Sequence, residues 1–443
     1  MEKACYFCRM DYRYARQSTG WIYVILMPFI HVVYRLMFRK IYLHNHQTVK
    51  PNTPVLIAAN HPTAFIDPIF FCLFFDPPVY NMTRGDIFRK PFFRKLLMSC
   101  NMFPVFRLRD GFDGRERNDD VFEFCKQKLH SRVAVNIFVE GEHHLDKRVL
   151  PAKKGIARIA FGTYEQYRLE DLQVIPVGCN YVDGTATRDE AKIIVGKPIF
   201  VKDYWPLYEK SPGAAITQLC RDIEQALKKI CYQVDDPNDD VLADQLLKLW
   251  RNTHAANRLP ILETQAPRFF GEKAVLDRLN ELAGEPKQAL REKTTAYFST
   301  LNALGLEDEG LVHPEHANFE WLLFLVLLAP IALLGYVITW PIRWTIYTVA
   351  RKKIKKAEFY TSVLMGLGVL VGGIYIAILL ATGILLNISW LITLALLMPL
   401  LSWVGVFWKE QYLRWCAARK SKAHSERAYL LRLRQELANL ISL

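Results

Sequence analysis

The sequence predicts an α/β fold with a mostly parallel sheet, followed by helical and strongly apolar segments. Short apolar runs at 55–59, 102–106, 133–139 and 174–178 are separated by stretches with helical periodicity. Strands that alternate with helices are typical of a parallel sheet with crossover helices. The carboxyl ends of such strands meet at one edge of the sheet. Polar residues that follow the runs are therefore expected to face one cleft.

The run 55–59 is followed directly by Asn60 and His61, and Asp67 comes six positions after His61. An imidazole with a nearby carboxylate can take a proton from a hydroxyl, because the carboxylate fixes the tautomer and stabilises the imidazolium. The alternative is structural, with the His capping a helix start and Asp67-Pro68 opening the next turn. The pair alone leaves both interpretations open.

Three further motifs follow the other runs. Arg107 stands after 102–106, Glu140-Gly141 after 133–139, and Pro176 lies inside the run 174–178. A guanidinium is permanently charged and can bind a phosphate with two hydrogen bonds. The alternative for Arg107 is a surface residue of a basic loop, since Arg109 lies nearby.

These four motifs resemble, in order and spacing, the four blocks of the glycerolipid acyltransferases, a family of glycerol-3-phosphate and 1-acylglycerol-3-phosphate O-acyltransferases. The resemblance covers roughly residues 50–200. It implies that His61 is the general base and Asp67 its orienting carboxylate. It also implies that the substrate-binding residues are Asn60, Arg107, Glu140, Gly141 and Pro176.

The sequence departs from the family pattern at two of the blocks. The commonest spacing in the family is His-x4-Asp, whereas this chain has His-x5-Asp with Pro62 directly after the His. The third block has Val139 where the family usually has Pro, and it lacks the Thr-Arg-Ser that often follows Glu-Gly. The missing Arg puts one phosphate contact of the family in doubt.

The expected chemistry is acyl transfer from a thioester to an alcohol. The thiolate leaves readily, so we expect no metal and no cofactor beyond the co-substrate, which is acyl-CoA or an acyl-carrier protein. A metal site could be drawn with His143-His144, but neighbouring His side chains point in different directions and no spaced ligand set accompanies them. Backbone N–H groups near Glu140-Gly141 are candidates for stabilising the oxyanion.

Two segments of the C-terminal half carry no charge, residues 321–342 and 359–408. The second is long enough to cross a bilayer twice, with a turn near Asn387. Its flanks are basic, so both should face the cytoplasm. The first segment is expected to be re-entrant and to return at Pro330, because this keeps the catalytic domain on the same cytoplasmic side. The expected location is therefore the inner (cytoplasmic) membrane.

These observations divide the chain into five parts: an N-terminal interfacial helix (1–40), an acyltransferase domain (41–235), a helical linker (236–318), a membrane region (319–410) and a basic cytoplasmic tail helix (411–443). An ordinary buried helix is the alternative for the first part. The net charge of +13, with basic residues beside aromatic ones, favours an anionic membrane surface over nucleic acid as partner. The other expected partners are the acyl donor, membrane lipids, and glycerol phosphate or a lysophospholipid as acceptor.

Several functions remain open from the sequence. The acceptor can be another lyso-lipid or an aminolipid. A non-catalytic lipid-binding protein could keep the same fold, although it would have little reason to keep both His61 and Asp67. A hydrolase would need a way to admit water to the same site.

Overall fold

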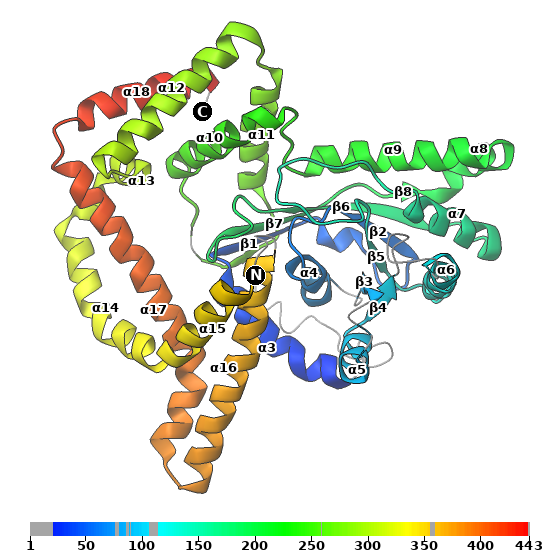
Figure 1. Cartoon of the computed structure of the whole chain (residues 1–443), viewed down its shortest axis with the longest axis horizontal. Helices are drawn as coiled ribbons and strands as arrows, with labels where there is room; N and C mark the ends of the chain where they lie inside the picture. The colour runs from blue at the N-terminus through cyan, green and yellow to red at the C-terminus, as the bar shows by residue number, and fades with distance from the viewer. Residues whose placement is uncertain are drawn as a thin grey trace, which may run out of the picture. The chain divides into compact units, whose positions relative to one another are not determined.

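A computed structural model describes residues 21–75, 79–85, 88, 90–105, 114–257, 259–354 and 359–441. The chain divides into two compact units (Figure 1). The first, called here the acyltransferase unit, ends at Tyr232 and also includes Pro260–Ala266; the second, the helical unit, contains Gln233–Leu259 and the chain from Pro267 onward. Each unit is described by itself.

The acyltransferase unit is built on one sheet with the strand order β4-β3-β5-β2-β6-β7-β1-β9, and β8 pairs with β6 beside this path. The strands are β1 Lys40–His44, β2 Val55–Ala59, β3 Tyr80–Arg84, β4 Met102–Val105, β5 Val135–Phe138, β6 Gln173–Asn180, β7 Glu190–Val195, β8 Ile199–Phe200 and β9 Leu262–Glu263. All neighbours from β4 to β6 are parallel, whereas β7 and β8 run antiparallel to β6. The predicted α/β class with a mostly parallel sheet is confirmed.

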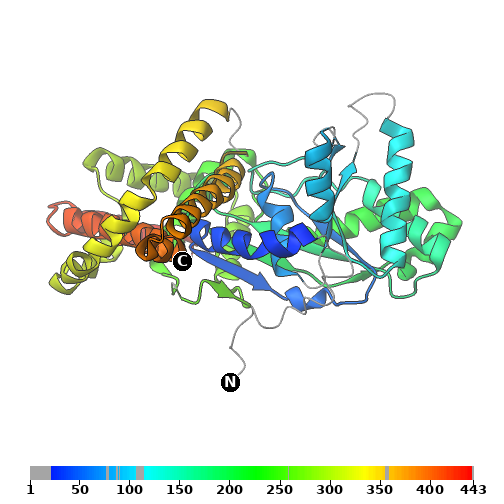
Figure 2. The ribbon, with the colours of Figure 1, turned by 90° about the horizontal axis from the view of Figure 1, so that it is seen from below.

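Helices cover both faces of this sheet. They are α3 Trp21–Met37, α4 Ile66–Phe74, α5 Pro91–Ser99, α6 Gly114–His130, α7 Gly155–Tyr167, α8 Trp205–Lys210 and α9 Pro212–Ile230. On one face, Leu56 and Ala58 of β2 belong to a core formed with α6, α7 and α9. On the opposite side lie α3 and α4 (Figure 1 and Figure 2). Every residue of β2 is buried, as expected for a parallel strand covered on both sides.

The helix α3 has two apolar faces. One is buried in the unit and includes Tyr34, whose hydroxyl donates to the carbonyl of Ile66 at 2.8 Å. The other leaves Ile25, Phe29 and Val32 exposed at 67%, 42% and 39%. An ordinary buried helix of a soluble unit would present polar residues there. The exposed apolar face is what the prediction of an interfacial helix requires, although the predicted segment also included residues 1–20, which lie outside the described residues.

The helical unit contains the region predicted as a linker. Its helices are α10 Asp240–Thr253, α11 Pro267–Glu281, α12 Gly284–Leu304, α13 Asp308–Val312, α14 Phe319–Ile338, α15 Trp340–Lys353, α16 Tyr360–Leu385, α17 Ser389–Lys422 and α18 Arg427–Ile441. The buried carboxylate of Asp308 accepts from Asn252 in α10, Tyr297 in α12 and Arg434 in α18. These contacts join α10, α12, α13 and α18. The same sequence region also sends β9 into the sheet of the acyltransferase unit.

Three helices of the helical unit, α14, α16 and α17, are long and apolar enough to cross a membrane by length and composition. The turn predicted near Asn387 is confirmed, since α16 ends at Leu385 and α17 begins at Ser389. The predicted return at Pro330 is wrong. The helix α14 continues through Pro330, and the chain changes direction only at Thr339, before α15. A proline removes one helical hydrogen bond, and apolar helices tolerate this where packing and neighbouring groups compensate.

The helix α14 packs antiparallel against α17, and the contacts fix its register. Trp408 Nε1 donates to the carbonyl of Leu325 at 2.8 Å, and a Cβ added at Gly335 would lie 2.2 Å from the carbonyl oxygen of Leu401. The end of α14 is therefore level with Leu401, inside the apolar run 359–408 rather than at its end. Figure 1 shows α14 and α15 as the two arms of a V.

Candidate active site

The centre of the site is His61, which lies just beyond the carboxyl end of β2. Its Nδ1 is 2.9 Å from Oδ2 of Asp67, a residue in the first turn of α4. The strand ends at Ala59 and the helix starts at Ile66, so the chain reverses in the intervening loop and brings the two side chains together. The predicted pair is thus formed despite the longer His-x5-Asp spacing.

The carboxylate of Asp67 is fully buried and accepts four hydrogen bonds. On Oδ2 the donors are His61 Nδ1 and the backbone N–H of Thr63, at 2.9 and 2.8 Å. On Oδ1 they are the hydroxyls of Thr63 and Tyr181, at 2.7 and 2.8 Å. Burial and the charge of Asp67 raise the pKa of Tyr181 well above its usual value, so this hydroxyl keeps its proton and donates. The carboxylate is therefore held in one orientation.

This arrangement leaves the other ring nitrogen of His61 for chemistry. Because Nδ1 donates to a carboxylate, the neutral ring carries its proton there and has its lone pair on Nε2. The ring stacks on Phe138, with centroids 3.7 Å apart and an interplanar angle of 11°. Within the described part of the chain, no hydrogen-bond donor or acceptor meets Nε2, and the side chain is 14% exposed. The geometry suits a general base.

The buried side chain of Glu140 holds the loops of the site together. Its Oε2 accepts from the backbone N–H of His61 at 3.1 Å, and its Oε1 accepts from that of Leu150 at 3.0 Å. Its Oε2 also lies 3.2 Å from Nε2 of His144. Burial alone would lower the pKa of His144, but the hydrogen bond and charge of Glu140 outweigh it and raise this pKa. The backbone N–H of His144 in turn donates to the carbonyl of His61 at 3.2 Å.

The turn after β5 needs a glycine. Gly141 has a φ of +73°, which a residue with a Cβ rarely adopts. Its N–H donates to the carbonyl of Phe138 at 3.2 Å, so this group is already used within the turn and is not open to an oxyanion. A Cβ at Gly141 would meet the side chain of Lys153 at 3.4 Å. Lys153 is exposed and lies beside the turn, which brings a cation close to the site.

Two of the predicted substrate-binding residues have structural roles. The side-chain amide of Asn60 donates to the carbonyl of Cys179 at 3.0 Å and accepts from its N–H at 2.7 Å. Pro176 is buried inside β6 opposite Ala58, and its carbonyl accepts from Gly196. Asn60 thus joins the end of β2 to β6, and Pro176 lies between β2 and the end of β7. Substrate contact by Asn60, Glu140, Gly141 or Pro176 stays a prediction.

Arg107 lies outside the described residues, which omit 106–113. Of the cations that follow the third motif, Lys153, Lys154 and Arg158 are all exposed.

Sequence reasoning missed Thr63 and Tyr181, whose hydroxyls donate to Oδ1 of Asp67, the oxygen that does not contact His61. Tyr181 is the first residue after β6. The rule that polar groups follow strand ends, which identified His61, would also have selected it. Thr63 lies inside the motif, but its neighbours along the chain do not reveal that its N–H and hydroxyl meet both oxygens of Asp67.

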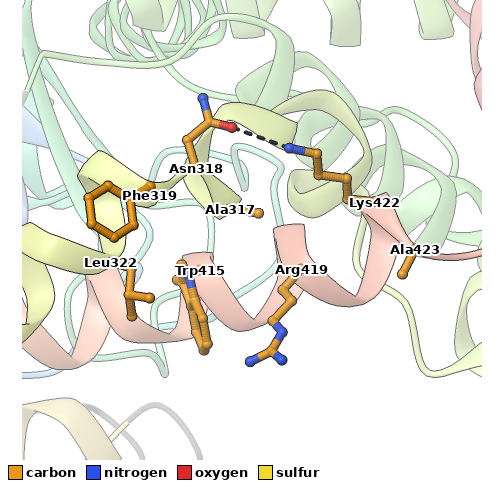
Figure 3. A pocket seen from close by; sticks show the side chains of 8 residues that line it. All are labelled: Ala317, Asn318, Phe319, Leu322, Trp415, Arg419, Lys422 and Ala423. Carbon is orange, nitrogen blue, oxygen red and sulfur yellow. Dashed lines mark hydrogen bonds between the residues drawn. The ribbon is translucent and has the colours of Figure 1, made fainter.

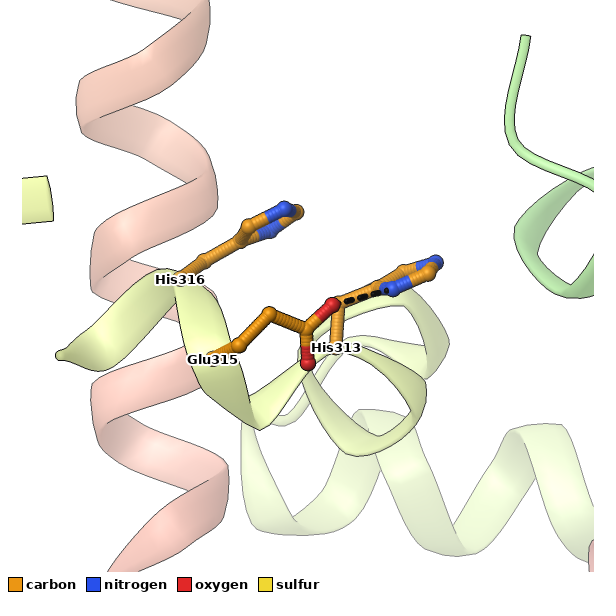
Figure 4. A group of neighbouring side chains, drawn as sticks. All are labelled: His313, Glu315 and His316. Atoms are coloured by element: carbon orange, nitrogen blue, oxygen red, sulfur yellow. Dashed lines mark hydrogen bonds and ion pairs between the residues drawn. The ribbon is translucent and has the colours of Figure 1, made fainter.

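A second cluster of titratable side chains, His313, Glu315 and His316, lies in the helical unit before α14 (Figure 4). Their nitrogen and oxygen atoms lie within 4.8 Å of one another. The two nitrogens of His313 face Glu315 Oε1 and the carbonyl of Asn252, each at 2.8 Å. Both ring nitrogens of His313 are thus next to an acceptor oxygen, and a metal ion would have to displace one of these contacts to bind there. His313 is within ion-pair distance of Glu315 in its own segment, and it contacts α10 through the carbonyl of Asn252.

Comparisons with known proteins agree with this geometry. Residues 40–180 match the family model described as Acyltransferase. Glycerol-3-phosphate O-acyltransferase 2 of Saccharomyces cerevisiae is 25% identical over 206 residues, which cover 46% of this chain and 27% of the yeast protein. An uncharacterized acyltransferase of Schizosaccharomyces pombe is 26% identical over 254 residues, covering 55% and 37%. Glycerol-3-phosphate O-acyltransferase 1 of Saccharomyces cerevisiae is 24% identical over 220 residues, covering 48% and 28%.

The sheet, the matched segment and the residues at the strand ends define an acyltransferase domain. Over this domain the chain is similar to glycerol-3-phosphate O-acyltransferases, the family that the motifs resemble. It spans less than two-fifths of the length of each of these three relatives.

Proposed function

We propose that this protein transfers a fatty acyl group from a thioester, acyl-CoA or acyl-carrier protein, to glycerol-3-phosphate or 1-acylglycerol-3-phosphate in phospholipid biosynthesis. The observation that carries the proposal is the His61–Asp67 pair, in which Nδ1 is fixed by a buried carboxylate and Nε2 is left open. Two of the yeast relatives are glycerol-3-phosphate O-acyltransferases, which supports glycerol-3-phosphate as an acceptor.

In the proposed reaction, Nε2 of His61 removes the proton of the acceptor hydroxyl as its oxygen attacks the thioester carbonyl. The new C–O bond forms, the C–S bond breaks, and the proton passes from the imidazolium to the leaving thiolate. Asp67 stabilises the imidazolium between these two transfers. A positioned general base contributes roughly 10²–10⁴-fold, and holding two substrates together contributes further.

The phosphate of the acceptor needs cations near the strand ends. We assign this role to Arg107, as the family resemblance implies, together with Lys153, whose side chain lies against Gly141. Each charge-assisted hydrogen bond to a phosphate contributes about 1.5–3 kcal/mol. Replacing either cation by Ala should therefore raise the KM for a phosphorylated acceptor by roughly 10- to 150-fold, and change the KM for the thioester much less.

The test uses the full chain purified in detergent, with a set of labelled thioesters and acceptors and the products read by mass spectrometry. We expect an acylated glycerol phosphate as product, and a loss of at least about 100-fold in His61→Ala. The matched control is His130→Ala, which removes an exposed imidazole at the end of α6, and it should retain activity.

Three results would contradict the proposal. Retention of more than about a tenth of the activity in His61→Ala would exclude this residue as the general base. Acylation of a different lyso-lipid or an aminolipid only would correct the acceptor, and thioester hydrolysis without any acylated product would indicate a hydrolase.

We further propose that the acyltransferase unit lies on the cytoplasmic side of its membrane, where thioester donors are made. The exposed apolar face of α3 supports direct contact with the lipid surface. The register of α14 on α17 supports a re-entrant V, with its turn at Thr339 inside the bilayer rather than on the far side. This leaves α16 and α17 as the two spans.

The topology is tested by labelling single introduced cysteines in sealed cells. The positions are Lys202 in the acyltransferase unit, Lys352 at the end of α15 and Asn387 in the turn between α16 and α17. We expect Lys202 and Lys352 to be labelled from one face of the membrane and Asn387 from the other. Labelling of Lys202 and Lys352 from opposite faces would make α14 a full span and end the re-entrant interpretation.

A further inference from the structure

The helical unit has a hollow of about 620 Å³ where α14 begins and α17 ends. It is lined by Ala317, Asn318, Phe319, Leu322, Trp415, Arg419, Lys422 and Ala423. Figure 3 shows Trp415 and Arg419 projecting together from α17, and Lys422 extending to Asn318. Apolar and cationic side chains thus border the same space.

The apolar surface of the helices indicates where the lipid lies relative to this hollow. The helix α17 carries no charge from Ser389 to Trp408, a length of about 29 Å at 1.5 Å per residue, and exposed apolar residues recur past Lys409 and Glu410 at Tyr412 and Leu413. The hydrocarbon core of a bilayer is about 30 Å thick. On α14 the exposed apolar surface begins at Phe319, which is itself part of the hollow. The hollow therefore falls at the boundary between hydrocarbon and headgroups.

The cations of the hollow lie beyond this boundary, on its polar side. Arg419 lies six residues past Leu413, or about 9 Å along the helix. Its guanidinium lies 5.0 Å from the centre of the Trp415 ring, and Trp is enriched at membrane interfaces. Lys422 Nζ donates to Asn318 Oδ1 at 3.3 Å, which leaves two of its three protons for another acceptor. Both side chains are exposed.

The start of α14 brings backbone N–H groups to the same place, and its first turn also carries the exposed carboxylate of Glu320. Asn318 precedes the helix but makes no side-chain capping bond, so the first N–H groups of this 20-residue helix are not satisfied by it. Such groups favour an anion. Arg419 and Lys422 also lie in the last turns of α17, where cations complement the helix dipole. The helix dipole of α17 alone would explain why cations are found at this end of the helix. It would not explain why they border a hollow that also contains Phe319 and Leu322.

We propose that this hollow binds the phosphate headgroup of an anionic membrane phospholipid, with Arg419 and Lys422 beside the phosphate and the acyl chains running along the apolar surface at Phe319 and Leu322. The site is separate from His61 and does not depend on the acyl-transfer reaction. It would select anionic lipids from the surrounding bilayer and hold the start of α14 against the end of α17.

The test measures the thermal unfolding of the full chain in phosphatidylcholine nanodiscs, with and without 20% phosphatidylglycerol. This anionic lipid is not a product of the proposed reaction, so the outcome is independent of the active site. We expect it to raise the Tm of the wild type, and we expect Arg419→Gln with Lys422→Gln to lose at least half of this increase. The control, Lys409→Gln with Lys420→Gln, removes the same charge from two other exposed positions of α17 and should keep the increase.

A second variant keeps the proposal testable if the double substitution disturbs the fold. Leu322→Trp leaves both cations in place and fills the hollow, and it should also reduce the increase in Tm. Equal losses in the double variant and its control would show general surface attraction and overturn the site. An equal increase with inorganic phosphate in place of the lipid would identify a free-phosphate site instead, and no increase in the wild type would refute the proposal.

Discussion

Substituting Asp67 by Asn tests how the buried carboxylate acts on His61. The two oxygens of Asp67 have different partners: Oδ2 faces two N–H groups, whereas Oδ1 faces two hydroxyls. An N–H cannot accept a hydrogen bond, but the hydroxyls of Thr63 and Tyr181 can turn and do so. The Asn side chain should therefore place its NH₂ toward the hydroxyls and its oxygen toward His61.

With that orientation, the tautomer of His61 is preserved and only the charge is lost. A hydrogen bond to a charged group contributes about 1.5–3 kcal/mol, compared with about 1 kcal/mol for a neutral pair. The imidazolium formed during proton transfer loses the difference, about 0.5–2 kcal/mol, so we expect kcat to fall by roughly 2- to 30-fold. A wrong tautomer would instead cost about 10⁴-fold, as in the serine protease triad.

The assay follows thiol release from the thioester at saturating acceptor, with the full chain in detergent. Combining Asp67→Asn with Thr63→Val and Tyr181→Phe removes the hydroxyl acceptors, and activity should then fall further toward the wrong-tautomer value. A loss near 10⁴-fold in Asp67→Asn alone would refute the reasoning about amide orientation. An unchanged kcat would show that His61 is not charged in the rate-limiting step.

Two further predictions concern stability. Gly335→Ala should lower the Tm in detergent, because the new Cβ would meet the backbone of Leu401 and such overpacking costs about 1–3 kcal/mol. The control is Gly366→Ala, where the Cβ meets nothing within 4 Å, and it should be neutral or stabilising. Equal changes in Tm for the two variants would refute the close contact at Gly335. The pKa of His144 is raised in the folded state by its contact with Glu140. This contact therefore stabilises the fold fully at pH values below the ordinary His pKa, and the stabilisation is lost as the pH rises through the raised pKa. His144→Gln should therefore lower the Tm more at mildly acidic than at alkaline pH, and a difference independent of pH would contradict the assignment.

The sequence predicted the centre of the site well because the relevant signals are local. The run 55–59 corresponds to β2, and His61 and Asp67 are separated by one loop, so their meeting depends on few residues. Tyr181 reaches the same carboxylate from the end of β6, 114 residues away in sequence. That contact depends on the order of strands in the sheet, which apolar runs do not specify.

The error at Pro330 has a different origin. Proline was interpreted from its behaviour in water-exposed helices, where it ends or kinks the helix. In α14 the surrounding residues are strongly apolar, and an interrupted helix would expose unpaired backbone groups to a medium that cannot satisfy them. The close packing on α17 then keeps the helix continuous, a contact that no local pattern in 321–342 indicates.

The double role of α3 has a practical consequence for obtaining a soluble enzyme. Its outer residues, among them Phe29, make it an obvious segment to delete when the acyltransferase unit is to be produced without detergent. The same helix carries Tyr34, which bonds to Ile66 next to Asp67 and packs edge-to-face on Phe70 of α4. Deletion would improve solubility but remove the contacts that support α4 next to Asp67. Replacing only the outward-facing apolar side chains by polar ones would keep that support.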